Sequence, residues 1–119
     1  MKPSERDPIL YLEDMVISMQ RVQEYMAGLD FEHFKSDYKT VDAVIRNFEI
    51  IGEASKNLPK IIKDKYTYVP WEEMYRLRNR ISHEYFGIDY RIIWDIATLQ
   101  LPLNHKDISE ILKLEKSKD

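Results

Sequence analysis

Residues 70–89 read PWEEMYRLRNRISHEYFGID, and residues 76–87 within them are the most informative part of the chain. Pro70 suits the beginning of a helix, because a backbone N–H in the first turn has no partner within the helix and proline has no N–H. Glu72 and Glu73 place negative charge where the helix dipole favours it. Apolar residues then recur at helical spacing, at Trp71, Met74, Leu77, Ile81 and Tyr85. The spacing predicts a helix that opens at Pro70-Trp71 and is closed by Gly87.

The chain after Gly87 predicts two more helices. Asp89 is a capping residue for a helix from Tyr90 to about Leu101. That helix is densely apolar, which indicates burial on more than one side, in a core or in a partner interface. Pro102 should kink or end it, and residues 103–114 form a last helix before a charged tail.

The chain before Pro70 predicts two long helices. Asp7-Pro8 begins the first, and Gly28 is a plausible stop. Residues 29–36 are a connector with one helical turn at 31–34, and the second helix runs from about Asp37 or Thr40 to Asn57. The expected buried stripes are Ile9, Leu12, Val16, Met19, Val22 (or Gln23) and Met26 in the first helix, and Val41, Val44, Ile45, Phe48, Ile51 and Ser55 in the second. Residues 59–70 form a connector with a short helical piece, and Gly52 permits close helix approach.

Composition supports a single all-α domain over residues 1–119, an up-and-down bundle of four to five helices. There are only 3 glycines and 5 prolines, and no cysteine, which excludes disulfides and thiolate chemistry. No apolar run approaches the roughly 20 residues of a bilayer span, and residues 1–7 do not resemble a signal peptide, so we expect a cytoplasmic protein without a membrane role. The net charge of −3 argues against a general nucleic-acid coating protein.

The predicted third helix gathers Arg76, Arg78, Asn79, Arg80 and His83 within eight positions. Arginine holds phosphate oxygens in a fork of donors, and histidine exchanges a proton near neutral pH, so this set suits work on a phosphodiester. By periodicity, Arg76 and Arg80 lie away from the core stripe, where their guanidinium groups can reach a phosphodiester.

Helix geometry limits how these groups can act together. Asn79 and His83 are one turn apart and share a face, whereas Arg78 lies about 140° from His83. Arg78 and His83 therefore cannot both face one small ligand from one straight helix. Either the helix end distorts near Gly87, or the ligand lies in a cleft between two copies of the helix, and we favour the dimer.

Each of these residues also has an ordinary structural interpretation. Arg78 can pair with a carboxylate such as Glu53, His83 can complement a helix dipole, and Tyr85 can be a packed aromatic side chain. A second basic group is most simply a solvated surface; it comprises Lys56, Lys60, Lys63 and Lys65. His33 and His105 are isolated and should be exposed, and no acidic and histidine residues stand at metal-ligand spacing, so we expect neither a metal nor a cofactor.

The series Arg78, four residues, His83, one residue, Tyr85 resembles the Arg-x4-His-x-Tyr pattern of HepT-like toxins in the HEPN superfamily. Asn79, directly after the arginine, fits the wider HEPN pattern. The resemblance extends over almost the whole chain, through residues 50–59, 69–71 and 86–89 and Trp94.

The resemblance implies an all-helical homodimer that is a metal-independent ribonuclease toxin. Arg78 would bind the scissile phosphate, His83 would move the proton, and Asn79 would orient the histidine or the phosphate. The implied partner is a minimal nucleotidyltransferase antitoxin, which would add AMP to Tyr85. Attack by the ribose 2′-hydroxyl would restrict cleavage to RNA. The alternative is a helical module without catalysis, which binds a nucleotide or RNA or docks an adenylyltransferase.

Overall fold

The structure is a computed structural model that describes residues 6–82 and 89–118, and of residues 78–82 only the backbone. Its elements in chain order are α1 (Pro8–Met26), α2 (Phe31–Ser36), α3 (Tyr38–Asn57), α4 (Lys60–Lys65), α5 (Trp71–Ser82), α6 (Tyr90–Asp95), the π-helical segment η2 (Ile96–Gln100) and α7 (Leu101–Lys116). The described residues contain no strand. The prediction of an all-α fold is confirmed.

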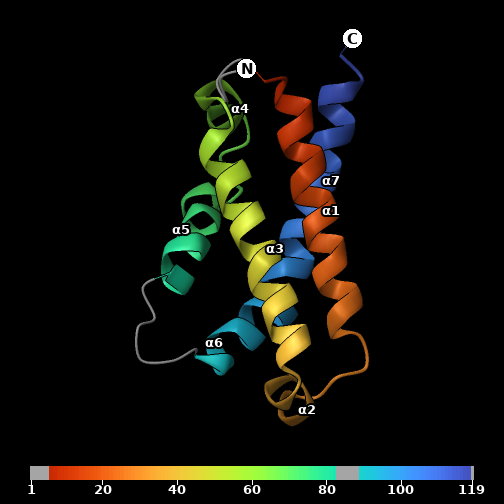
Figure 1. Cartoon of the computed structure of the whole chain (residues 1–119). Helices are drawn as coiled ribbons and strands as arrows, with labels where there is room; N and C mark the ends of the chain where they lie inside the picture. The colour runs from red at the N-terminus through yellow and green to blue at the C-terminus, as the bar shows by residue number, and fades with distance from the viewer. Residues whose placement is uncertain (1–5, 83–88, 119) are drawn as a thin grey trace.

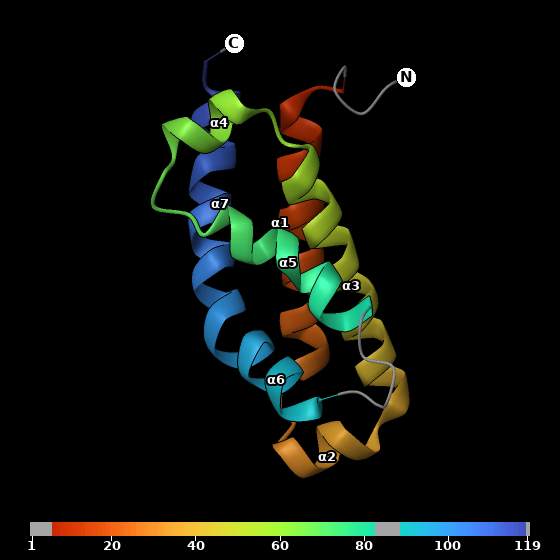
Figure 2. The ribbon, with the colours of Figure 1, turned by 90° about the vertical axis from the view of Figure 1, so that its left-hand side faces the viewer.

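The long helices α1, α3 and α7 form the body of the bundle (Figure 1). α1 packs against both α3 and α7, and α3 packs against α5 on its other side. Turned by 90°, the molecule shows α5 crossing in front of α1, with α3 on one side and α7 on the other (Figure 2). The short helices α2 and α4 turn the chain at opposite ends of the body. The arrangement is the predicted helical bundle, and it holds α5 on the outside.

Aspartates cap several of the helices: the sequence predicted this for Asp7 and Asp89, and it left the start of the second helix open between Asp37, which is the cap, and Thr40. In chain order, the three aspartate side chains accept hydrogen bonds from the backbone N–H groups of Ile9, Thr40 and Ile92 at 2.9, 3.2 and 3.1 Å. Each bond satisfies a donor that the helix itself leaves without a partner. After α1 the chain reverses at Gly28, whose φ of +78° is a conformation that residues with a Cβ rarely adopt.

The core runs along α1, α3 and α7 and extends to α5. Its fully buried side chains include Leu12, Met15, Met19, Phe34, Phe48, Ile51, Leu101, Ile108 and Ile111. Tyr11 and Met15 are buried although neither belongs to the predicted stripe, whereas Ile9 and Val16 are only half-buried. α1 contacts α3 on one side and α7 on the other, so its buried arc is wider than one stripe.

The sequence predicted that Pro102 kinks or ends the helix, and the second of these alternatives is wrong. The chain stays helical from Tyr90 to Lys116, so Pro102 does not end the helix. Proline cannot donate to the carbonyl four residues earlier and crowds it. The helix widens just before it, and the N–H of Leu101 bonds to the carbonyl of Ile96 five residues back.

The dense apolar pattern of residues 92–99 is also only partly buried. Ile93, Ile96 and Ala97 are buried, but Leu99 is 66% exposed and Ile92 is 36% exposed. The core of the single chain therefore does not bury this helix on more than one side, and the predicted alternative, burial in a partner interface, stays a prediction. Among the described residues, no helix combines the length and apolar character that a bilayer span requires.

Candidate functional site

The predicted site belongs to α5, which begins at Trp71 with Glu72 and Glu73 in its first turn. Two buried hydrogen bonds hold this end. The hydroxyl of Ser55 on α3 donates to the carbonyl oxygen of Trp71 at 3.0 Å, and the Trp71 indole N–H donates to the carbonyl oxygen of Tyr66 at 3.0 Å. The start of α5 is thus fixed to α3 and to the segment after α4.

The register of α5 follows from its buried residues. Trp71, Met74 and Leu77 are 8%, 2% and 4% exposed, so the predicted apolar stripe is confirmed over the part that is described. Arg76 lies off this stripe: its side chain is 65% exposed, and its Nε is 3.7 Å from a carboxylate oxygen of Glu72. The sequence placed Arg76 away from the core, and the structure agrees.

The other predicted site residues are described less fully. Arg78, Asn79 and Arg80 belong to α5, and the structure describes their backbone but not their side chains. His83 and Tyr85 lie outside the described residues. Asn79 and Arg80 follow the exposed Arg76 by three and four residues, which is one helical turn. The roles of these five residues stay predictions.

The lysines of the second basic group differ in their surroundings. Lys60 pairs with Asp64 at 2.6 Å, where both side chains are well exposed, and Lys65 pairs with Glu115 at 3.1 Å. Lys56 lies beside α5, with its Nζ 6.0 Å from the centroid of the Tyr75 ring. The exposed pair of Lys60 fits the solvated surface that the sequence favoured.

Burial lowers the pKa of Lys63, which the nearby Glu72 carboxylate opposes. The Nζ of Lys63 is 3.5 Å from the carbonyl oxygen of Lys56, in the last turn of α3. A carbonyl in this turn has no partner within the helix, so Lys63 closes the end of α3 and lies next to the start of α5.

His33 is exposed, as expected, but it is not isolated. Its Nδ1 lies 2.7 Å from Asp30 Oδ1, with both side chains well exposed, and its backbone N–H donates to the same carboxylate. His33 thus belongs to the cap of α2. Within the described parts of the chain, no three histidine or acidic side chains gather as metal ligands would.

The comparisons with known proteins bear on this helix. A family model described as "Ribonuclease HepT-like" matches residues 15–113, which include all of α5 and the residues between α5 and α6. The chain belongs to the HepT-like ribonuclease family. The family predicted from the spacing of Arg78, His83 and Tyr85 is therefore confirmed.

Several relatives of this HepT-like chain carry ribonuclease names. "Putative RNase MJ0127" of Methanocaldococcus jannaschii is 44% identical over 92% of this chain and 90% of its own length. "Putative RNase TTE0752" of Caldanaerobacter subterraneus subsp. tengcongensis is 41% identical over 93% of this chain and 99% of its own. "Probable ribonuclease HepT" of Thermococcus cleftensis is 43% identical over 86% of this chain and 90% of its own. No solved structure matches the chain.

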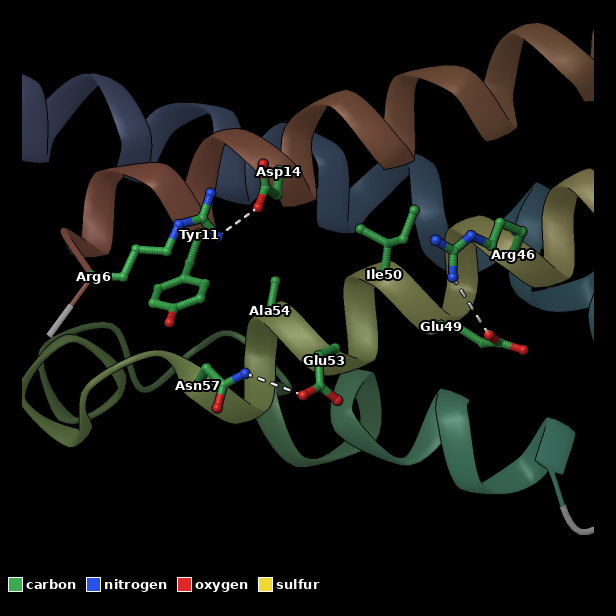
Figure 3. Close-up of a pocket in the computed structure, with 9 residues that line it drawn as sticks. All are labelled: Arg6, Tyr11, Asp14, Arg46, Glu49, Ile50, Glu53, Ala54 and Asn57. Carbon is green, nitrogen blue, oxygen red and sulfur yellow. Dashed lines mark hydrogen bonds and ion pairs between the residues drawn. The ribbon is translucent and has the colours of Figure 1, made fainter. Parts of the chain in front are cut away.

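The HepT-like chain also has a pocket that the sequence did not predict, between the first half of α1 and the exposed side of α3 (Figure 3). It encloses about 380 Å³. Arg6 closes one end, where its Nη1 lies 2.8 Å from Asp14, and Arg46 lies at the other end, 3.9 Å from Glu49. The lining residues are Arg6, Tyr11, Asp14, Arg46, Glu49, Ile50, Glu53, Ala54 and Asn57.

The charges of this pocket do not suit a phosphate. Two arginines and three carboxylates line it, so negative side chains outnumber positive ones. Glu53, which the sequence offered as a partner for Arg78, accepts a hydrogen bond from the Asn57 amide at 3.3 Å. RNA phosphates need a surplus of positive charge. The exposed side of α5 therefore remains the better candidate site in the HepT-like chain.

Proposed function

We propose that the chain is an endoribonuclease and the toxin of a toxin–antitoxin pair. The observation that carries the proposal is the series Arg78, Asn79, His83 and Tyr85 in and directly after an outer helix of a HepT-like ribonuclease. Arg76, exposed on the same helix, supports it, because a guanidinium in that place can hold an RNA phosphate.

The proposed reaction is an internal transesterification. His83 takes the proton of the ribose 2′-hydroxyl, the 2′-oxygen bonds to phosphorus, and the bond from phosphorus to the 5′-oxygen breaks. The leaving oxygen takes a proton from the second copy's imidazole or from water. Arg78 stabilises the charge on the phosphorane oxygens, and Asn79 orients His83 or the phosphate. The products are a 2′,3′-cyclic phosphate and a 5′-hydroxyl, and no metal takes part.

The proposed active unit is a homodimer. On one straight helix, Arg78 and His83 are about 140° apart. A phosphate that contacts both must therefore receive one of them from a second copy of the chain. A two-fold axis beside α5 would line one cleft with two arginines and two histidines. Arg76 and Arg80, one turn apart, would extend the positive charge along the RNA.

The proposed control of the toxin is chemical modification. A minimal nucleotidyltransferase antitoxin would transfer AMP to the hydroxyl of Tyr85, with release of pyrophosphate from ATP. Tyr85 is two residues from His83, so the added phosphate and adenosine would occupy the cleft and repel an RNA phosphate.

The test of this function is the variant His83→Ala, with His33→Ala as the matched control. His83→Ala should keep the helical circular dichroism and the dimer mass, lose RNA cleavage and relieve growth arrest. His33→Ala should cleave like the wild type, because His33 belongs to the cap of α2. Cleavage should persist in EDTA and stop when the nucleotide 5′ to the cut is 2′-deoxy. Undiminished cleavage by His83→Ala would refute the proposal.

A further inference from the structure

A groove lies between α5 and the helix formed by η2 and α7, next to the candidate site. It encloses about 180 Å³. Its apolar walls come from both sides: Pro70, Met74 and Leu77 from α5 and the residue before it, and Leu103 from α7. Met74 and Leu77 are buried, so this wall is part of the core surface. The groove is thus apolar where it is deepest.

Polar side chains complete the lining. Glu73 comes from the first turn of α5, and Gln100 and Asn104 come from the opposite side, one helical turn apart. Gln100 is the last residue of the π-helical segment, and Asn104 lies in the first turn of α7. Carboxylate and amide groups therefore lie in the same groove as apolar walls, so both hydrogen-bond donors and acceptors are available.

A second hollow of about 270 Å³ adjoins the groove and leads toward the candidate site. It shares Glu73, Leu77 and Gln100 with the groove and adds Arg76. The hollow thus connects the groove to a guanidinium of the helix that carries Arg78 and Asn79. A ligand that spans both would have its apolar part in the groove and its negative part at Arg76.

We propose that this groove binds a single base of the RNA, on a nucleotide neighbouring the scissile phosphate. The inference rests on the proposed ribonuclease function and adds a specificity site to it. A nucleobase has flat apolar faces and a polar edge, which matches apolar walls with a few polar groups. The phosphate of the same nucleotide would lie against Arg76, and the chain would continue to the cleft.

The carboxylate of Glu73 determines which base fits best. An ionised carboxylate only accepts hydrogen bonds, so it requires N–H groups on the base edge. Guanine offers two neighbouring donors, N1–H and the N2 amino group, together with the O6 acceptor that an amide of Gln100 or Asn104 can meet. Uracil has one N–H between two carbonyl oxygens, which the carboxylate repels. The groove therefore prefers guanine over adenine and cytosine, and disfavours uracil.

The test compares short RNAs that differ only at one nucleotide beside the cut. The wild type should favour guanine by about tenfold or more over uracil in kcat/KM, the discrimination expected of a two-bond contact. Glu73→Gln should remove most of this preference. The matched control is Glu72→Gln, because Glu72 is adjacent on α5 but does not line the groove. It should keep the preference.

A binding measurement separates this inference from the cleavage proposal. Fluorescence anisotropy with 2′-O-methyl trinucleotides, which cannot be cleaved by 2′-hydroxyl attack, should show the same order of bases and the same loss in Glu73→Gln. If the probes show this preference in binding while the unmodified RNAs are not cleaved, the groove is supported and the ribonuclease proposal is defeated.

Two outcomes would overturn the inference. One is an equal response to all four bases in the wild type. The other concerns Leu103, which is 66% exposed at the edge of the groove. If Leu103→Ser halves the mass found by light scattering, a second copy of the chain covers this groove and no base can enter it.

Discussion

The hydroxyl of Ser55 on α3 donates a hydrogen bond to the carbonyl oxygen of Trp71, the first residue of α5, over 3.0 Å. Both residues are buried, and Ser55 is fully so. Because the bond joins two residues that are 16 positions apart in sequence and belong to different helices, it fixes where the candidate site helix begins. The position of α5 against α3 depends on this contact as well as on apolar packing.

Ser55→Ala should lower the free energy of unfolding by about 1–3 kcal/mol, because it removes the donor and leaves a buried carbonyl without it. The matched control is Ser117→Ala, whose hydroxyl donates to the carbonyl oxygen of Leu114 on the exposed end of α7. The control should change stability by less than about 0.5 kcal/mol. Urea unfolding at pH 7 measures both. Equal values for the two variants would show that the Ser55 contact does not hold α5.

Glu115 joins α7 to the segment after α4. Its carboxylate accepts a hydrogen bond from the Tyr66 hydroxyl and lies 3.1 Å from Lys65 Nζ and from Lys118 Nζ. The Tyr66 hydrogen bond is the main cause that holds the pKa of Glu115 below its ordinary value, and Lys65 adds to it. Burial and the same bond raise the pKa of Tyr66 to about 12.

These shifts predict how stability depends on pH. The pKa of Glu115 is lower in the folded chain than in the unfolded chain, so its contribution is present above the unfolded value and is lost as pH falls through the folded one. Glu115→Gln should therefore be less stable than the wild type at pH 7, with a gap that closes in acid. Urea unfolding at pH 7 and pH 3 measures this gap. Glu110→Gln, exposed on the same helix, should show little gap at either pH, and a Glu115 gap unchanged at pH 3 would contradict the assignment.

Most helix boundaries could be predicted because local chemistry sets them. Asp7 and Asp89 cap helices in the structure as the sequence indicated, and Gly28 makes the turn after α1. The effect of Pro102 could not be predicted in the same way. A proline within a helical pattern can end the helix, kink it or widen the preceding turn, and packing of η2 and α7 against α1 favours the last outcome.

The candidate site was predictable only as far as one helix defines it. Spacing placed Arg76 off the buried stripe of α5, and the structure agrees. The groove beside Glu73 was not predictable, because Gln100 and Asn104 come from a helix distant in sequence. The pocket near Arg6 and Asp14 was not predictable for the same reason, because its lining forms only when α1 and α3 pack together.

Tyr85 should be the residue that receives AMP. Co-expression of the chain with a minimal nucleotidyltransferase should add the mass of one AMP group, and tandem mass spectrometry should locate it on Tyr85. Tyr85→Phe should lose the added mass and retain RNA cleavage in the presence of the nucleotidyltransferase. The control is Tyr75→Phe on α5, where the Tyr75 ring is half-buried beside Lys56; this variant should still gain the mass of AMP. AMP on another residue, or no added mass, would remove Tyr85 from the proposal.

The composite cleft predicts complementation between two inactive variants. Arg78→Ala and His83→Ala should each lower kcat by about 10²–10³-fold, as loss of a transition-state contact does. In a mixed dimer of the two, one copy supplies the guanidinium and the other supplies the imidazole, so one pair can still meet in the shared cleft. Co-expression with two different tags and sequential purification yields the mixed dimer, and its cleavage rate should lie well above that of either parent.

The control for this experiment is the double variant Arg78→Ala/His83→Ala paired with His83→Ala, which offers no imidazole and should stay inactive. The competing geometry is a distorted helix end near Gly87, where both groups act from the same chain. In that case the mixed dimer contains no complete set and should be as slow as its parents. Because the separation of about 140° between the two positions permits only these two arrangements, the rate of the mixed dimer decides between them.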